Sequence, residues 1–147
     1  MIELSGQNEV KRPNLLLFLK DPSSFSKCIP NLESLEIKSP TEFTAKFKVE
    51  VPEEFGISYL KNIGIKMNFI ISSQNNTVSM HGEGRSMGLK VKIDITIEVV
   101  EYEGYSIMKW KATVDIGMLE RMLGKENIDK FSNDIISKLV ACVSSSE

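Results

Sequence analysis

Few residues in this chain have the types and spacing that enzyme chemistry requires. The chain contains one histidine, His81, and the alternation around it places it on the solvent side of a strand, opposite Met80 and Gly82. Ser86 lacks the Gly-x-Ser-x-Gly context of a strained nucleophile turn. Asp115 precedes the last apolar segment, where a carboxylate commonly caps a helix or interacts with its positive end. These residues indicate a surface histidine and a structural acid rather than a catalytic pair.

Other kinds of reactive site are equally poorly represented. The sequence shows no Cys/His cluster, no paired inward carboxylates and no glycine-rich phosphate loop. We therefore expect no catalytic residues, no bound metal and no cofactor. The pattern does not decide whether four further polar residues face the interior or the solvent: Tyr59, Asn68, Tyr102 and Tyr105.

Composition and charge favour a single soluble globular domain over residues 1–147. Of the 147 residues, 41% are hydrophobic and 26% are charged, which is ordinary for such a domain. The formal net charge is −2 and the lysines are scattered over polar strand faces, so nucleic acid is not an expected partner. We interpret Lys90, Lys92, Lys109 and Lys111 as parts of a solvated sheet face.

The two cysteines, Cys28 and Cys142, are too few for a disulfide framework and have no metal-ligand spacing. Both lie in apolar surroundings, which predicts buried free thiols in a reducing compartment. The first residues resemble no signal peptide, and no apolar run approaches the ~20 residues that span a bilayer. We therefore predict a cytoplasmic protein.

The clearest structural pattern lies in the second half of the chain. Apolar and polar residues alternate strictly over 89–99 and again over 108–116, which is typical of strands with one dry and one wet face. An apolar repeat close to 3.6 residues then runs over 119–143 and predicts one long two-sided helix. The dry sheet face and the dry helix stripe are expected to cover each other.

The rest of the chain predicts five more strands and two short helices. Pro13 suits the first turn of a helix that ends at Asp21-Pro22, and a second short helix is expected to stop before Pro30. Residues 52–62 predict an irregular excursion. The further strands are predicted over 2–10, 32–38, 43–51, 63–71 and 78–85. Short connections favour antiparallel neighbours, so we predict an α+β fold with a seven-stranded antiparallel sheet.

Several short motifs carry a resemblance to a known family. Residues 19–22 (Leu-Lys-Asp-Pro) and 28–36 (Cys-Ile-Pro-Asn-Leu-Glu-Ser-Leu-Glu) resemble a signature of the carbon monoxide dehydrogenase G-subunit (CoxG) family. Residues 81–84 (His-Gly-Glu-Gly), 115–117 (Asp-Ile-Gly) and 123–124 (Leu-Gly) also fit its pattern. The order of elements is similar to the START/Bet v 1-like superfamily (SRPBCC). That resemblance implies a helix-grip fold, in which a curved sheet wraps the C-terminal helix.

The resemblance also implies a function. Family members are expected to bind a hydrophobic small molecule, lipid- or quinone-like, as accessories of a molybdenum-containing carbon monoxide dehydrogenase or a related enzyme. Peripheral contact with the inner face of the membrane is implied for the family. The chain departs from the family pattern at residues 15–18 (Leu-Leu-Leu-Phe), where the family usually carries an aromatic, often tryptophan. Longer members carry a C-terminal extension thought to reach the membrane, whereas this chain ends at Glu147, just past the last helix, which weakens a tethering role here. Two alternatives remain open, a cyclase- or hydratase-like enzyme and a co-chaperone-like interaction module.

A cavity between sheet and helix is the structural requirement of the binding hypothesis. Gly82 and Gly84 fall on the dry face and would leave side-chain volume empty, although they could equally mark a strand bend that lets the helix approach. Gly124 interrupts the helical pattern, either as a bend over a pocket mouth or as the end of a first turn. Methionine and aromatic residues on the dry faces suit a variable ligand, but they also fill ordinary irregular cores. The predicted lining comprises Phe47, Met67, Phe69, Met80, Gly82, Gly84, Met108, Trp110, Met118 and Met122.

Overall fold

The computed structural model describes residues 2–50, 62–86 and 88–144. The predicted irregular segment over 52–62 therefore lies almost entirely outside the described residues. The strands are β1 (Ile2–Val10), β2 (Leu32–Ser39), β3 (Glu42–Glu50), β4 (Asn62–Gln74), β5 (Thr77–Ser86), β6 (Leu89–Tyr102) and β7 (Tyr105–Asp115). The helices are α1 (Leu15–Lys20), α2 (Pro22–Phe25), the short 3-10 helix η1 (Ser26–Cys28), α3 (Met118–Leu123) and α4 (Lys125–Ser144).

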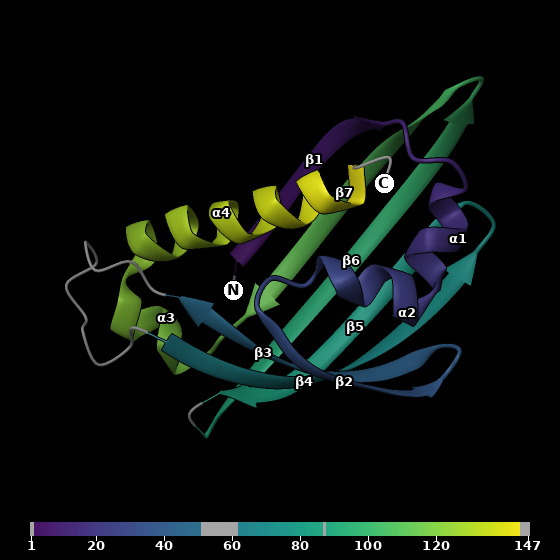
Figure 1. The fold of residues 1–147 in the computed structure, drawn as a ribbon. Helices are drawn as coiled ribbons and strands as arrows, with labels where there is room; N and C mark the ends of the chain where they lie inside the picture. Colours follow the sequence, from purple (N-terminus) through teal and green to yellow (C-terminus); the bar gives the residue numbers. More distant parts are fainter. Residues whose placement is uncertain (1, 51–61, 87, 145–147) are drawn as a thin grey trace.

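The seven strands form one antiparallel sheet in the order β1-β7-β6-β5-β4-β3-β2. The helices α1, α2 and α4 lie on one side of this sheet, and the strands curve beneath them (Figure 1). We call the helix-covered side the inner face and the opposite side the outer face. This architecture confirms the α+β helix-grip prediction, with two short helices after β1 and a C-terminal helix across the sheet.

Tight turns hold the register of the long strands. Asn75 and Asn76 alone connect β4 to β5, and Asn75 has a φ of 54°. Gly104 has a φ of 84° in the connection of β6 to β7. Positive φ values are the geometry that asparagine and glycine accept most readily, so these residues suit the two tight turns.

The path between β1 and β2 is set by one acidic residue and one proline. Asp21 is the N-cap of α2, where its carboxylate accepts a hydrogen bond from the Ser23 backbone N–H at 3.1 Å. The hydroxyl groups of Ser23 and Ser24 also donate to this carboxylate and hold the pKa of Asp21 below its usual range. Pro22 occupies the first helical position, where its missing N–H is not needed.

The single long helix predicted over 119–143 is interrupted in the structure. Gly124 has φ 83° and ψ 149°, values that end α3 and let α4 begin at Lys125. Its N–H donates to the Glu120 carbonyl, while its own carbonyl accepts from the Ile128 N–H. Of the two roles considered for Gly124, the end of a short first helix is therefore the one observed.

The core fills the space between the inner face and the helices. Its principal cluster joins β3 to β7 with α1, α2 and the end of α4, around fully buried residues such as Leu19, Phe43 and Val78. A second cluster joins Ile128 at the start of α4 to Ile2 of β1. Helix α4 is thus packed against the body of the protein at both of its ends.

The prediction of two free thiols is wrong, because Cys28 and Cys142 form a disulfide. Their Cα atoms are 5.5 Å apart although 114 positions separate them in the sequence. The bond joins η1 to the last turns of α4. The apolar surroundings indicated burial correctly for Cys28, but burial alone could not reveal that the fold brings the two sulfur atoms together.

Arg12 reinforces the same end of α4. Its Nε donates to the Val143 carbonyl at 2.9 Å and its Nη2 donates to the Cys142 carbonyl at 3.1 Å. The guanidinium also lies over the Phe18 ring, 3.9 Å from the ring centre. A cation at a helix C-terminus satisfies free carbonyl groups and interacts favourably with the helix dipole.

Candidate functional site

The candidate site is a small apolar cavity between the middle of the sheet and α4. Its volume is about 20 Å³. All of its lining side chains are apolar or aromatic: Phe25, Ile95, Ile97, Met108, Trp110, Ala112, Ile136, Leu139, Val140 and Val143. The cavity is therefore suited to hydrocarbon and not to chemistry that needs charged groups.

The burial of α4 varies along its length in a way that matters for this cavity. Ile128 and Val143, near the two ends, are each only 1% exposed. Between them, Ile136, Leu139 and Val140 are only partly buried. The helix is thus anchored at both ends and less completely packed over the cavity.

The indole N–H of Trp110 is already used in a hydrogen bond within the protein. Trp110 Nε1 donates to the Asn8 side-chain oxygen on β1 at 2.9 Å. Gly6 permits this position, because a Cβ there would lie 2.6 Å from the indole ring. The satisfied N–H leaves the rest of the ring as an apolar wall.

The paired glycines of β5 do not create the hollow predicted from them. A Cβ on Gly82 would lie 2.7 Å from both Phe69 Cε1 and Ile93 Cγ2. A Cβ on Gly84 would collide with the Lys66 carbonyl and with Met67. Side chains of the neighbouring strands occupy this space, so the glycines allow close packing within the sheet.

The structure places the predicted lining residues in several environments. Met108 and Trp110 line the cavity. Phe47, Met67, Phe69 and Met80 belong to the surrounding core without lining the cavity. Gly82 is buried and Gly84 is partly buried, and neither lines the cavity. Met118 is 61% exposed and lines a separate surface hollow beside Gly117, Glu120 and Arg121. The side chain of Met122 lies outside the described residues.

Eight lining residues were not singled out from the sequence. Most are aliphatic residues on the dry faces of strands and of the last helix: Phe25, Ile95, Ile97, Ala112, Ile136, Leu139, Val140 and Val143. The alternation and the helical repeat did place all of them except Phe25 on inner faces. Only the register of the sheet and the rotation of α4 show which of the inner residues meet at one point.

His81 has more contacts than a solitary surface histidine. Its Nδ1 lies 2.6 Å from Asp94 Oδ1 on β6, and its Nε2 lies 3.1 Å from Glu83 Oε1. The hydrogen bond with Asp94, and to a lesser extent that with Glu83, raises the pKa of His81 above its ordinary value of 6.5. Glu83 also lies near Lys92, with its Oε1 4.0 Å from Lys92 Nζ. The cluster is exposed on the outer face, as the alternation predicts.

The other polar residues considered as possible inward groups do not reach the cavity. On the outer face, the Asn68 side chain accepts a hydrogen bond from the Thr44 hydroxyl and donates one to the Glu42 carboxylate. Tyr102 and Tyr105 stack on each other at an exposed hairpin, and Tyr59 lies outside the described residues. Asp115 accepts a hydrogen bond from the N–H of Gly117, the N-cap residue of α3; among the described residues no side chain caps this helix, so Asp115 does not act as its N-cap.

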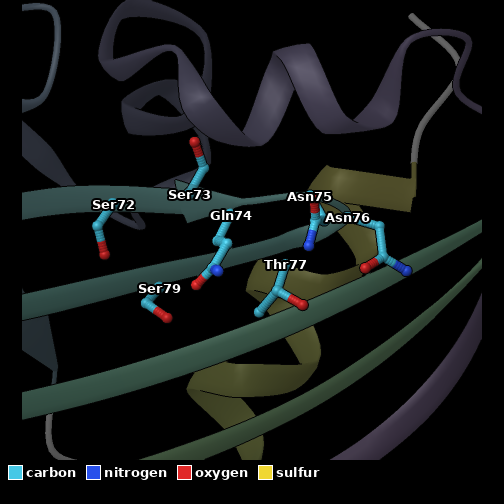
Figure 2. A pocket seen from close by; sticks show the side chains of 7 residues that line it. All are labelled: Ser72, Ser73, Gln74, Asn75, Asn76, Thr77 and Ser79. Carbon is cyan, nitrogen blue, oxygen red and sulfur yellow. The ribbon is translucent and has the colours of Figure 1, made fainter.

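A polar hollow at the β4–β5 hairpin offers no titratable group. Figure 2 shows hydroxyl and amide side chains around it, with Ser73 on the opposite side of its strand from Ser72. Among the described residues, no group of three or more His, Cys, Asp or Glu side chains could hold a metal ion. Within the same residues, no helix is both long and apolar enough to cross a membrane.

Comparison with known families gives the position of this chain among proteins. The sequence profile of the carbon monoxide dehydrogenase G-subunit (CoxG) matches residues 6–146. The chain belongs to the CoxG family. No curated protein matches it in sequence.

Solved structures agree with the helix-grip fold of this CoxG-family chain. A conserved protein from Geobacillus kaustophilus has a TM-score of 0.79 at 17% identity, over 97% of this chain and 93% of that one. A START superfamily protein from Mycobacterium smegmatis has a TM-score of 0.71 at 9% identity, over 97% and 94%. The Zhui aromatase/cyclase from Streptomyces has a TM-score of 0.60 at 10% identity, over 97% and 90%. At these identities the likeness concerns the fold alone.

Proposed function

We propose that this CoxG-family protein binds a hydrophobic small molecule, lipid- or quinone-like, between the inner face of the sheet and α4, without transforming it. The observation that carries the proposal is the apolar cavity beneath the partly buried residues Ile136, Leu139 and Val140 of α4. Met108 and Trp110 would contact the ligand from the sheet, and Leu139 and Val140 from the helix. Phe47, Met67, Phe69, Met80, Gly82 and Gly84 would form the deeper wall.

Binding requires the helix to move. A volume of about 20 Å³ holds one water molecule at most, whereas sites for drug-sized ligands measure roughly 300–1,000 Å³. The described conformation is then the closed state, and a ligand would lift the middle of α4. The partly buried side chains there have less apolar contact to lose than Ile128 and Val143, so the middle is the part most easily displaced.

The family description supports a further part of the proposal, an accessory role beside a carbon monoxide dehydrogenase-type molybdenum enzyme. In that role the protein would hold a lipophilic molecule for a redox partner, at most in peripheral contact with a membrane. The ring and alkyl chain of a quinone match an aromatic and aliphatic lining. The cavity wall contributes no charged side chain, which favours holding over catalysis.

A pair of substitutions on α4 tests the binding site. Leu139→Trp fills the cavity, whereas Ile135→Trp adds the same ring one turn away at a partly buried position that does not line it. With decylubiquinone as the probe, native mass spectrometry and tryptophan quenching should show binding to the wild type and to Ile135→Trp. Binding to Leu139→Trp should be at least about tenfold weaker, because the indole ring occupies the space that the probe needs. Equal binding by both variants would refute the site.

One observation favours a second function, a co-chaperone-like interaction module. Leu35 and Ile37 pair with inner-face residues of β3 yet are 37% and 48% exposed on the edge strand β2. Exposed apolar residues beside a nearly filled interior are what such a module predicts. The two functions separate experimentally: the module requires Leu35→Ser/Ile37→Ser to abolish capture of a partner protein, and the binding proposal requires both substitutions to leave decylubiquinone affinity unchanged.

A further inference from the structure

The register of the sheet assembles a row of positive charge that is not visible along the sequence. Lys46 of β3 lies directly opposite Lys66 of β4, Lys66 opposite Arg85 of β5, and Arg85 opposite Lys90 of β6. All four residues are exposed, and their alternation with buried neighbours places them on the outer face of the sheet. We call these four residues the basic row. With strands about 4.8 Å apart, the basic row is roughly 14 Å long.

The basic row is unfavourable for the folded protein by itself. Like charges directly opposite each other on neighbouring strands repel and destabilise a sheet. Nearby lysines have acidic partners: Lys48 Nζ lies 3.7 Å from Glu33 Oε2, and Lys92 Nζ lies 4.0 Å from Glu83 Oε1. Within the described ranges, no salt bridge involves any of the four residues of the basic row. The separation of charge is notable in a chain whose formal net charge is −2.

We propose that the basic row is a docking surface for an acidic segment of a partner protein. A line of carboxylates opposite four aligned cations would replace their mutual repulsion with attraction and would guide association. Acidic residues three and four positions apart on a helix are about 5–6 Å apart, close to the interstrand spacing of the basic row. This inference is independent of the cavity beneath α4 on the other face.

The width of the basic row favours a protein partner over a membrane. The next set of outer-face positions lies two residues further along the strands. In this set, Glu83 of β5 and Asp115 of β7 lie opposite Lys92 of β6, one on each side. A flat anionic bilayer pressed against the outer face would bring these carboxylates against its phosphate groups. A narrow acidic segment contacts the basic row alone.

Charge-neutral variants test the proposal with poly-L-glutamate as the acidic probe. Lys66→Gln/Arg85→Gln removes the centre of the basic row. Lys109→Gln/Lys111→Gln removes the same charge from β7 of the same face, where Glu98 lies opposite Lys109. Fluorescence anisotropy at low salt should show a Kd about fivefold higher for the first variant, since each exposed charge pair is individually weak. The second variant should differ little from the wild type.

Three results would overturn the proposal. One is equal weakening in both variants, which would indicate dependence on overall charge. Another is unchanged affinity in Lys66→Gln/Arg85→Gln. The third is binding to vesicles of phosphatidylglycerol, sensitive to the same variant, without binding to poly-L-glutamate. Binding to poly-L-glutamate that is lost in the first variant alone supports it.

A stability measurement checks the physical basis without any partner. Relief of repulsion in Lys66→Gln/Arg85→Gln should raise the unfolding temperature by about 1–2 °C at low salt. The increase should disappear in 1 M salt, where the screening length is only about 3 Å. A lower unfolding temperature of Lys66→Gln/Arg85→Gln at low salt would show that the basic row does not destabilise the folded protein. It would then remove the reason to infer a partner.

Discussion

At the scale of single residues, cross-strand register gives side chains roles that sequence neighbours do not indicate. His81 gains Asp94 as its partner only because β5 and β6 align at that position. When protonated, its ring N–H groups can donate to Asp94 and Glu83 together, which explains the raised pKa. The group is exposed, so its contribution to stability is small.

The raised pKa of His81 predicts a defined pH dependence. A folded-state pKa above the unfolded value of 6.5 gives a stabilisation that is complete below pH 6.5 and is lost as pH rises through the folded value. Because His81 is the only histidine, its ring protons can be followed alone by NMR titration. Asp94→Asn should return the pKa toward 6.5. An unchanged pKa in that variant would contradict the hydrogen bond to Asp94 as its principal cause.

Gly82 provides a second prediction at this scale. Gly82→Ala places a methyl group 2.7 Å from Phe69 and Ile93, so one of these core side chains must shift. Overpacking of this kind costs about 1–3 kcal/mol in the free energy of unfolding, measurable by urea denaturation. Gly88→Ala is not a suitable control because its φ is 79°. Gly64→Ala is a suitable control, because a Cβ at this position meets nothing within 4 Å. This substitution should leave the free energy of unfolding nearly unchanged.

At the scale of elements, α4 is the part of the fold on whose attachment the proposed binding function depends. Its N-terminal end packs on β1 through Ile128 and Ile2. Its C-terminal end is held by the Cys28–Cys142 disulfide, by Val143 and by the two hydrogen bonds from Arg12. The disulfide closes a long loop, a condition under which a cross-link restricts the unfolded chain strongly.

Removing the disulfide should therefore destabilise the protein. Cys28→Ser/Cys142→Ser is expected to lower the free energy of unfolding by about 2–5 kcal/mol. The wild type should lose a similar amount in a dithiol reductant, whereas the double variant should not respond to the reductant. Denaturation with and without reductant measures both effects. Alkylation of two free thiols in unreduced, unfolded wild type would contradict the disulfide directly.

At the scale of the whole molecule, the two faces of the sheet are suited to different tasks. The inner face and α4 enclose an apolar cavity, and the outer face displays charge. Phe25 and Val143 in the cavity wall lie close in sequence to Cys28 and Cys142, so we expect any opening of the cavity to be coupled to the disulfide. Ligand uptake should depend on how firmly the C-terminal end of α4 is held.

This coupling predicts faster uptake of a lipophilic probe by the reduced protein. Stopped-flow mixing with decylubiquinone should show a higher association rate in reductant for the wild type and no such increase for Cys28→Ser/Cys142→Ser. At a probe concentration of 100 Kd, binding should stabilise the protein by about 2.7 kcal/mol in a thermal shift measurement. Identical rates in oxidised and reduced wild type would show that α4 opens elsewhere.

The sequence by itself determined the layers of this protein. Alternation over 89–99 and 108–116 and the apolar repeat after 118 specified a half-buried sheet covered by a helix, because burial follows the periods of strand and helix. The prolines at positions 13, 22 and 30 located the two short helices after the first strand through local backbone restrictions. The motif of residues 28–36 led to the CoxG family, which the profile match confirms.

Only the tertiary structure decided what these layers bring together. The filled space at Gly82 and the basic row depend on which strand positions face each other, and the Cys28–Cys142 bond depends on where the end of α4 meets η1. Periodicity assigns a residue to a face but carries no information on its neighbours across strands distant in sequence. The size of the cavity depends on how side chains interlock beneath α4, a property of packing in three dimensions that no one-dimensional pattern contains.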